Sequence, residues 1–448
     1  MSGARRGGTG TRARRARARA RLSRKAGPAG SRGTAPPGRV PLAGTRIGPS
    51  GRTLALTLLN RTGHRKGEAV SDSALAAAHD VPTFGVEEEF LLVDRVSRAP
   101  ADTAPRVIDT ARMSLGDQVT CELFTSQLEL RTRPAATLGG LRADLARLRA
   151  EAGAAAARDG CLLVASGTVV VPGRRAARIT DRPRYRRVAA HVGAVARGSQ
   201  AVLNGCHVHV GMRDRGEALG LSNHLRPWLP VLQAMAANSP FCGGRDTGYG
   251  SWRAIAWSRW PTVGPAPVLD PAQYEHLATA LVASGLILDR KMIYWYSRPS
   301  EHLPTLEIRV ADTNCDLDTT VLLAALVRGL AVSMLPAVRD GKPADEVHPE
   351  LLKAAHWKAA RGGLEGVGLD PATGDESAVW RLVDRMAERA RPGLAASGDA
   401  AAVHALLDRL RSRGGGAARQ RAVFRERGRL RDVVDELARD TASPDAAG

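Results

Sequence analysis

The chain has 448 residues, of which 44% are hydrophobic, and this is enough for one large domain or two ordinary ones around a buried core. Its formal charge of +20 resembles that of a nucleic-acid-binding protein, but residues 1–80 alone hold 17 Lys and Arg against 3 Asp and Glu. The other 368 residues carry 48 basic and 42 acidic side chains, and this near balance argues against a general nucleic-acid-binding surface on the body of the chain.

Residues 1–80 are rich in Arg, Gly, Ala and Pro and show no hydrophobic period, so we expect a disordered extension. Two other interpretations are non-specific binding of nucleic acid or another acidic surface, and an export signal. The export signal is the weaker of the two because no apolar stretch of useful length follows the arginines. We favour a disordered extension, translated from sequence upstream of a later natural start. We therefore expect a catalytic domain at 81–440 and a second disordered tail at 441–448.

The cysteines and the apolar stretches indicate a cytoplasmic protein. The five cysteines contain no CxxC pair, which is typical of reduced thiols rather than of a disulfide framework. The longest apolar stretch, residues 319–338, is interrupted by Arg328. We interpret it as a buried helix and expect no membrane span.

Short strands and long segments of helix or loop alternate after residue 81. Strands are predicted at 83–94, 121–132, 161–172, 200–212 and 304–313. Helices are predicted at 138–160, 227–240 and 271–285, and over most of the chain after 313 with breaks at 341–346, 362–374 and 411–418. Because nearly every strand alternates functional and apolar side chains, one face is packed and one is open, which is typical of an antiparallel sheet. The predicted fold class is α+β.

The first predicted strand, TFGVEEEFLLVD, carries three consecutive glutamates within an apolar run. Successive side chains point to opposite faces, so Glu87 and Glu89 share one face with Gly85, whereas Glu88 lies on the apolar face. Two carboxylates roughly 6.5–7 Å apart on one face ionise at low cost only beside a cation, and Mg²⁺ prefers such oxygen ligands. The alternative is a solvated edge strand with spare charge.

Each of three further strands carries polar residues on one face and apolar residues on the other. These polar residues are Glu129 and Arg131, His207 and His209, and Glu307 and Arg309. Four such strands indicate a sheet whose polar face lines a cation-filled cleft. The His-x-His pair could also ligate zinc, but no Cys and His pairs at zinc-site spacing and no HExxH are present in the sequence. Without GxxxxGK[ST], GxGxxG or a serine nucleophile elbow, nucleotide chemistry would depend on carboxylate-held metals and arginines.

The chain resembles the glutamate–cysteine ligase superfamily, and more closely its bacterial type 2 carboxylate–amine ligase subgroup. The matching segments are GVEEEF, ELFTSQLELRT, NGCHVHVGM, NSP, TGYGSWR and PTLEIRVADT, followed by HWKAARGGLEGVG (356–368) and GGGAARQR (414–421). The resemblance runs from Phe84 to Leu437 and implies a glutamine-synthetase-like antiparallel sheet flanked by helices, with the active site on its open face. It also implies that ATP phosphorylates the γ-carboxylate of glutamate and that the amine of cysteine displaces phosphate, giving γ-glutamylcysteine and ADP.

The resemblance assigns roles to individual side chains. The expected Mg²⁺ ligands are Glu87, Glu89, Glu129, Glu307 and His207. Arg309 matches the arginine that contacts phosphate, and we expect it to be catalytic together with Glu307. The expected substrate or nucleotide contacts are His207, His209, Arg253, Tyr249 and Arg309. Glu122 lies in the motif without a defined role, and the Gly/Trp-rich segment 243–267, with Trp252 and Trp257, is equally consistent with a packed surface loop.

One position departs from the subgroup, which commonly has Gly-Thr-His-Pro where this chain has Gly-Thr-Val-Val, with Val169 in place of the histidine. This puts a substrate or nucleotide contact from this loop in doubt. We expect ATP and Mg²⁺ as cofactors and glutamate with cysteine as substrates. A different amine acceptor, a carboxylate kinase-like activity and nucleic acid binding through the basic tail are the alternatives. The resemblance is compatible with a homodimer, and we expect no membrane association and no specific nucleic acid binding.

Overall fold

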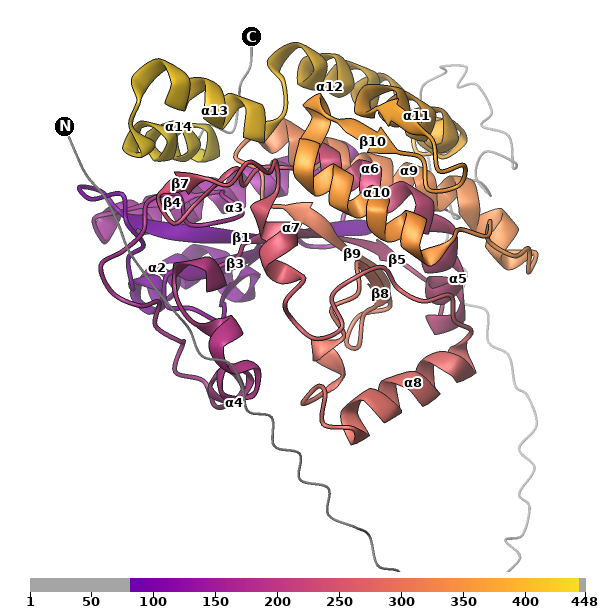
Figure 1. Cartoon of the computed structure of the whole chain (residues 1–448), viewed down its shortest axis with the longest axis horizontal. Coiled ribbons are helices and arrows are strands. Elements are labelled where there is room, and N and C mark those ends of the chain that lie inside the picture. The colour runs from indigo at the N-terminus through magenta and orange to yellow at the C-terminus, as the bar shows by residue number, and fades with distance from the viewer. Residues whose placement is uncertain (1–80, 443–448) are drawn as a thin grey trace, which may run out of the picture. The chain divides into compact units, whose positions relative to one another are not determined.

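The computed structural model describes residues 81–442, so the predictions for residues 1–80 and 443–448 concern residues outside that range. Its centre is a seven-stranded antiparallel sheet in the order β2-β3-β1-β5-β9-β8, with β4 paired to β1 (Figure 1). The strands are β1 (Phe84–Asp94), β2 (Val119–Cys121), β3 (Gln127–Arg131), β4 (Cys161–Val164), β5 (Gly205–Gly211), β8 (Ser297–Pro299) and β9 (Thr305–Asp312). The predicted α+β class is confirmed.

The register of the strands decides which side chains meet on the sheet. Glu87 of β1 lies opposite His207 of β5 on one side and Arg131 of β3 on the other. His209 of β5 lies opposite Glu307 of β9. Directly opposed residues of an antiparallel pair share a face and have their Cβ atoms about 5 Å apart. The polar face predicted from alternation is therefore one continuous surface across four strands.

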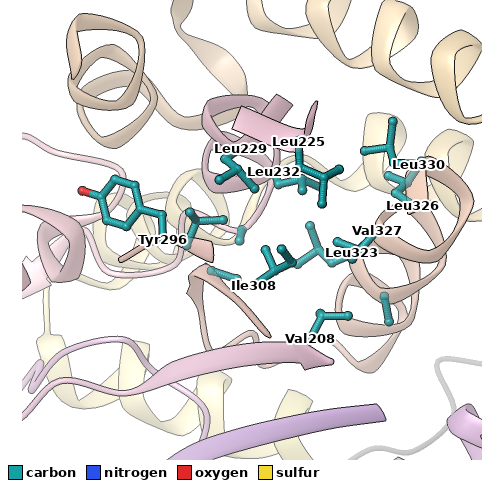
Figure 2. Packing of buried hydrophobic residues seen from close by; sticks show 14 of the residues in the cluster. Val208, Leu225, Leu229, Leu232, Tyr296, Ile308, Leu323, Leu326, Val327 and Leu330 are labelled. Carbon is teal, nitrogen blue, oxygen red and sulfur yellow. The ribbon is translucent and has the colours of Figure 1, made fainter. Parts of the chain in front are cut away.

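The other face of the sheet is apolar and is covered by helices (Figure 1). They include α3 (Leu138–Arg158), α5 (Arg215–Leu225), α6 (Leu229–Met235) and α9 (Leu317–Arg339). Figure 2 shows leucines of α5 and α6 facing leucines of α9, with Val208 of β5 and Ile308 of β9 below them. Burial of this apolar area fixes the register, because a slip by one residue would turn every polar side chain of a strand into the core.

Helix α9 is the buried helix predicted at 319–338. Among the described residues it is long and apolar enough to cross a membrane, but 72% of its apolar window is buried inside the protein. The guanidinium of Arg328 is fully buried, forms an ion pair with Asp399 and lies 3.8 Å from the ring centre of Phe84. This charge interrupts the apolar run and is compensated within the protein, as expected for a core helix.

The remaining elements lie around this core. Helix α2 (Ala104–Leu115) packs against α3, whereas α4 (Pro183–Val192) and α8 (Pro271–Ala283) lie on the side of the sheet away from α6 and α9 (Figure 1). Helix α7 (Trp252–Trp257) lies within the predicted Gly/Trp-rich loop. The C-terminal part contains α10 (Pro349–Gly362), α11 (Val379–Ala396), α12 (Ala400–Arg413), α13 (Gly416–Arg427) and α14 (Leu430–Ala442). Two small hairpins complete the fold: β6 (Phe241–Cys242) with β7 (Arg245–Asp246), and β10 (Val367–Leu369) with β11 (Glu376–Ala378).

Several predicted boundaries were wrong. The strand predicted at 121–132 is a hairpin of β2 and β3, whose turn contains Glu122. The strand predicted at 161–172 ends at Val164, where the chain turns and Ser166 donates a hydrogen bond to the carbonyl of Thr168. Thr441, which we expected in the C-terminal tail, is instead buried in α14 and accepts a hydrogen bond from the backbone N–H of Ala165. Helices α2, α4 and α5 were not predicted.

Candidate active site

The first cluster of the site joins β1, β5 and β9 and consists of Glu87, His209 and Glu307; we call it the Glu87 group. Each member offers one ligand atom, and these atoms lie within 4.8 Å of one another. The Nε2 atom of His209 is 3.5 Å from Oε2 of Glu87. The cluster follows directly from the strand register, because Glu307 is the cross-strand neighbour of His209.

The second cluster consists of Glu89, Glu122 and Glu129; we call it the Glu89 group, and its three carboxylates also lie within 4.8 Å of one another. Glu89 of β1 lies opposite Glu129 of β3, and Glu122 comes from the turn between β2 and β3. Oε2 of Glu89 accepts a hydrogen bond of 2.6 Å from the backbone N–H of Gly205, and Oε2 of Glu122 accepts one of 3.3 Å from the hydroxyl of Tyr185.

His207 lies between the two groups. Its Nδ1 atom is 3.6 Å from Glu87 and 3.7 Å from Glu307, and its Nε2 atom is 4.0 Å from Glu89. We expected one shared set of ligands containing His207; the structure instead divides the carboxylates into two groups, places His209 in the first and adds Glu122 to the second. The reason is that Glu87 and Glu89, two residues apart, face different neighbours across the strands.

Two arginines contact the buried end of the Glu87 group. The guanidinium of Arg309 donates to Oε1 of Glu307, and Nε of Arg298 donates to Oε2 of Glu307 over 3.1 Å. Arg298 lies opposite Glu307 in the pairing of β8 with β9. Nε of Arg309 is buried without a hydrogen-bond partner. Arg309 therefore keeps one unpaired N–H donor while it holds Glu307.

These neighbours decide the protonation of the Glu87 group. Burial opposes ionisation of Glu307, but Arg309, Arg298 and the two histidines outweigh it and lower its pKa to about 2. Burial likewise opposes ionisation of Glu87, and the nearby His207 and His209 bring its pKa well below the usual range. Burial and Arg309 lower the pKa of His207 to about 4, whereas Glu87 and Glu307 overcome burial and raise the pKa of His209.

The Glu89 group shows the opposite behaviour. Burial and the neighbouring Glu122 raise the pKa of Glu89 to about 8. Burial, together with the carboxylates of Glu87, Glu122 and Glu89, raises the pKa of Glu129 well above its usual range. Burial is also the main cause of the raised pKa of Glu122. Three mutually repelling carboxyl groups thus share one place, and an added cation would relieve the repulsion.

Two cavities open on either side of these groups. A cavity of about 590 Å³ is lined by Glu87 and His209 and by basic residues that include Arg131 and Arg213. A smaller cavity of about 120 Å³ is lined by Glu89, Glu122, His207, Arg253 and Arg309. Glu87 and His209 therefore face the larger cavity, and Glu89 and Glu122 face the smaller one.

The predicted contacts from the 243–267 segment are only partly brought to the site. Arg253 lines the smaller cavity, and its guanidinium and that of Arg309 lie 4.7 Å and 5.7 Å from the ring centre of Trp257. Tyr249 lines neither of the two cavities. It packs instead against Trp252, with 5.4 Å between ring centres, and against the exposed Trp357.

Two positions that the sequence singled out lie outside the polar face. Glu88 is buried on the apolar face, where Arg149 and the hydroxyl of Thr320 donate to its carboxylate. Val169 is fully buried in an apolar cluster and lines neither of the two cavities. The side chain in place of the subgroup's histidine therefore belongs to the core of this protein.

The side chains of the polar face are largely buried, although two cavities open onto it. Glu89, His207 and Glu307 are 8%, 3% and 3% exposed. Arg184 and Tyr185 of α4 line the smaller cavity, so this helix covers part of the face. Three residues near the site, Arg298, Asp312 and Tyr185, were not predicted from the sequence. Arg298 was predictable, because SRPSEHLPTLE (297–307) has the pattern of a strand, a turn and a second strand that carries Glu307.

The fold and the site thus combine an antiparallel sheet with two carboxylate clusters and two arginines that bind Glu307. A sequence model described as glutamate–cysteine ligase family 2 matches residues 83–436. The protein named "Putative glutamate–cysteine ligase 2-1" of Saccharopolyspora erythraea is 45% identical over 366 residues, covering 82% of this chain and 96% of that protein. A relative named "Putative glutamate–cysteine ligase 2" of Salinispora tropica is 43% identical over 364 residues, covering 81% and 96%.

Solved structures show the same fold at much lower identity. The glutamate–cysteine ligase of Francisella tularensis, determined in complex with AMP, has a TM-score of 0.60 at 13% identity and covers 82% of this chain and 90% of its own. A bifunctional glutathione synthetase of Pasteurella multocida has a TM-score of 0.59 at 15% identity and covers 83% and 54%. The chain belongs to glutamate–cysteine ligase family 2 and is an ATP-dependent carboxylate–amine ligase.

Proposed function

We propose that this enzyme joins the γ-carboxylate of glutamate to the amine of cysteine, with ATP as the phosphoryl donor and Mg²⁺ as the metal cofactor. The observation that carries the proposal is that Glu87 and His209 line one cavity, whereas Glu89, Glu122 and Arg309 line a second cavity of different size. The larger cavity has room for a nucleotide and basic residues along its wall. The smaller one has room for an amino acid, and the guanidinium groups of Arg253 and Arg309 in its wall can bind carboxylates.

The residues present fit Mg²⁺. The Glu89 group offers three carboxylate oxygens at one place, which is the donor set that hard divalent cations prefer. Nε2 of His209 and Nδ1 of His207 are buried without hydrogen-bond partners. Glu89, Glu122 and Glu129 would hold one ion, and Glu87 and Glu307 with His209 would hold another. Bound Mg²⁺ would supply positive charge for the phosphate oxygens of ATP.

The side chains support a reaction in two transfers. The γ-carboxylate of glutamate attacks the terminal phosphorus of ATP, so that an acyl phosphate forms and ADP leaves. The amine of cysteine then attacks the acyl carbon, the carbon–oxygen bond to phosphate breaks, and the amine loses a proton. In this proposal Arg309 binds the transferring phosphoryl group, which its unpaired Nε–H and its contact with Glu307 support. Burial of the site excludes water, which would hydrolyse the acyl phosphate.

A direct assay tests this proposal. Purified protein is incubated with Mg·ATP, L-glutamate and L-cysteine, and ADP and γ-glutamylcysteine are measured by enzyme-coupled detection and mass spectrometry. A parallel preparation of Glu307→Gln controls for contaminating ligases. We expect both products from the wild type and neither from the variant. No release of ADP with glutamate and cysteine would overturn the choice of substrates.

Another amine acceptor is the main alternative, and a panel of amines in place of cysteine separates the two proposals. The acceptor with the highest kcat/KM identifies the reaction, and ADP release without an amide product would indicate a carboxylate kinase-like activity.

We also propose that residues 81–440 contain the whole catalytic machinery and that the basic residues 1–80 do not take part in ligation. Deletion of residues 1–80 should leave kcat/KM unchanged within about two-fold. Binding to DNA that falls steeply with salt and is lost on this deletion would instead support the nucleic acid alternative. The homodimer stays a prediction, and size-exclusion chromatography with light scattering tests it.

A further inference from the structure

Arg253 is the most deeply buried cation of the smaller cavity and has an unusual lack of partners. It is 3% exposed, and its Nε and Nη1 atoms have no hydrogen-bond partner. Its guanidinium passes over β5 at Gly205, where an added Cβ would lie 2.2 Å from Nη2. A buried guanidinium with unpaired donors is costly unless an anion binds it, and Arg253 lines the smaller cavity, where such an anion can reach it.

Asp312, at the end of β9, holds the segment that carries Arg253. Its Oδ2 atom accepts hydrogen bonds from the backbone N–H of Asn238 (2.9 Å) and from the hydroxyl of Ser239 (2.6 Å). Its Oδ1 atom accepts one from the hydroxyl of Ser251 (2.8 Å) and lies 3.9 Å from Nη1 of Arg253. Oδ2 of Asp312 therefore accepts two hydrogen bonds, whereas Oδ1 accepts one and faces the guanidinium of Arg253.

The two serines that bind Asp312 also accept hydrogen bonds from the backbone of α7. The hydroxyl oxygen of Ser239 accepts a hydrogen bond of 3.0 Å from the backbone N–H of Arg253. The hydroxyl oxygen of Ser251 caps α7 by accepting from the backbone N–H of Ala254 over 3.2 Å. Asp312 thus contacts the main chain of Arg253 through Ser239, and its carboxylate is 3.9 Å from the guanidinium.

We propose that Asp312 is the positioning residue of Arg253, which it aims at a carboxylate of an amino-acid substrate bound in the smaller cavity. This inference rests on the proposed function for the identity of the bound compound. Asp312 lines neither of the two cavities, so it acts through Arg253 and touches no substrate. Neither its role nor that of its partners is needed for the phosphoryl transfer described above.

The network also gives a role to the Gly-rich C-terminal motif at 414–421. The side-chain amide of Gln420 donates to the carbonyl of Asn238 (3.0 Å) and to its Oδ1 (2.8 Å). A Cβ on Gly416 would lie 2.3 Å from the same Oδ1, so the glycine allows α13 to approach. The motif therefore fixes Asn238, whose N–H donates to Asp312.

The test compares Asp312→Asn with Asp399→Asn. Asp399 is a matched control, because it is a buried aspartate paired with an arginine, Arg328, and lines neither of the two cavities. We expect Asp312→Asn to raise the KM for glutamate or for cysteine at least about ten-fold with kcat changed less than about three-fold. Asp399→Asn should lower the Tm and leave both KM values unchanged. A lower Tm with unchanged KM values in Asp312→Asn would overturn the inference and leave Asp312 a structural residue.

A double-mutant cycle shows whether Asp312 acts through Arg253. In the Arg253→Lys background, Asp312→Asn should add less than about two-fold to KM, because the guanidinium that it positions is already absent. If the increase in KM of the double variant equalled the product of the increases of the two single variants, the result would contradict the proposal. Should Asp312→Asn fail to fold, Ser239→Ala tests the same link, and an unchanged KM in that variant would count against the proposal.

Calorimetric titration with L-glutamate and with L-cysteine separates this inference from the proposed function. Failure of the wild type to release ADP with any amine would overturn the proposed function alone. The titration still compares the wild type with Asp312→Asn, and we expect the Kd of one amino acid to rise at least about ten-fold. If the wild type and Asp312→Asn had the same Kd for L-glutamate and the same Kd for L-cysteine, the positioning role would be overturned.

Discussion

The Glu87 group and the Glu89 group are neighbours on one sheet face, yet their surroundings differ in charge. In the Glu87 group, Glu307 receives hydrogen bonds from Arg298 and Arg309, and Glu87 lies beside two histidines. In the Glu89 group, three carboxylates face one another, and Arg131, which is 3.8 Å from Glu129, has a side chain that is 44% exposed. The protein thus compensates the charge of the first group itself and leaves the second to protons or to an added cation.

The difference indicates distinct roles for two groups of similar composition. A carboxylate that is ionised and held by arginines, such as Glu307, is preorganised, and this is the condition for electrostatic stabilisation of a transition state. Carboxyl groups that repel one another store unfavourable energy until a cation binds. We therefore expect metal binding to change the Glu89 group more than the Glu87 group.

The largest effect should come from Glu307→Gln. The variant leaves Arg298 and Arg309 without their carboxylate partner, and we expect kcat to fall on the order of 10³-fold with the fold intact by circular dichroism. Glu87→Gln should have a similar effect. ADP release at saturating substrates measures both. The control is Glu301→Gln, whose carboxylate binds Tyr274 and Arg215 outside the two cavities. Rates like those of the wild type in either site variant would contradict the assignment.

The second prediction contrasts this variant with Glu129→Gln. We expect the kcat of Glu129→Gln to fall about 10²-fold, because a metal ligand is lost. Its metal-free form, however, should be as stable as the wild type or more stable at pH 7.5, because the folded wild type must bind a proton at Glu129, whose pKa is raised, and a glutamine removes this cost. Glu307→Gln should instead lower the Tm of the metal-free protein. Differential scanning fluorimetry in EDTA measures the change in Tm of each variant. Changes in the same direction would show that the two groups do not differ in how the protein compensates their charge.

The sequence predicted the polar face because strand alternation is a local property. Glu87, Glu129, His207 and Glu307 each follow an apolar neighbour, and the period of two places them on one face without knowledge of the fold. The division into two groups depends on which residues are opposite across strands, such as Glu87 with His207 and Glu89 with Glu129. That register is fixed by packing over the whole sheet and could not be read from any single segment.

Residues outside regular strands were the least predictable part of the site. Glu122 joins its group because β2 and β3 form a tight hairpin, which the sequence shows only as one long strand pattern. Asp312 and Ser239 are 73 positions apart and meet through the fold alone. Tyr249 was expected at the site from its place in a motif, but its aromatic neighbours Trp252 and Trp357 hold it elsewhere.

The third prediction concerns pH and Mg²⁺. Because the pKa of Glu89 is raised to about 8 by burial and Glu122, the folded metal-free protein binds a proton that the unfolded chain has released above pH 4.5. The contribution of this group to stability is therefore present at low pH and is lost as pH rises toward 8. A divalent cation replaces the protons, so the increase in Tm caused by Mg²⁺ should be small near pH 5.5 and on the order of 5 °C near pH 8.

Fluorimetry with and without 5–10 mM MgCl₂, roughly 100-fold above the expected Kd, measures this difference across the pH range. In Glu129→Gln the pH dependence should be weaker, because fewer protons are displaced. An increase in Tm that is the same at pH 5.5 and pH 8 would show that the cation binds elsewhere.

The smallest effect is expected from Arg131→Gln. Arg131 is the cation of β3 nearest to Glu129, but its side chain is 44% exposed, and ion pairs of this kind contribute only about 0–1 kcal/mol. We expect a change in Tm below about 2 °C and in kcat below about three-fold. Arg298→Gln, which removes a side chain only 11% exposed from Glu307, should reduce kcat at least about ten-fold. If the two arginine variants had equal effects, the protein would compensate the Glu89 group as fully as the Glu87 group, and the need for an added cation would no longer follow from the charges.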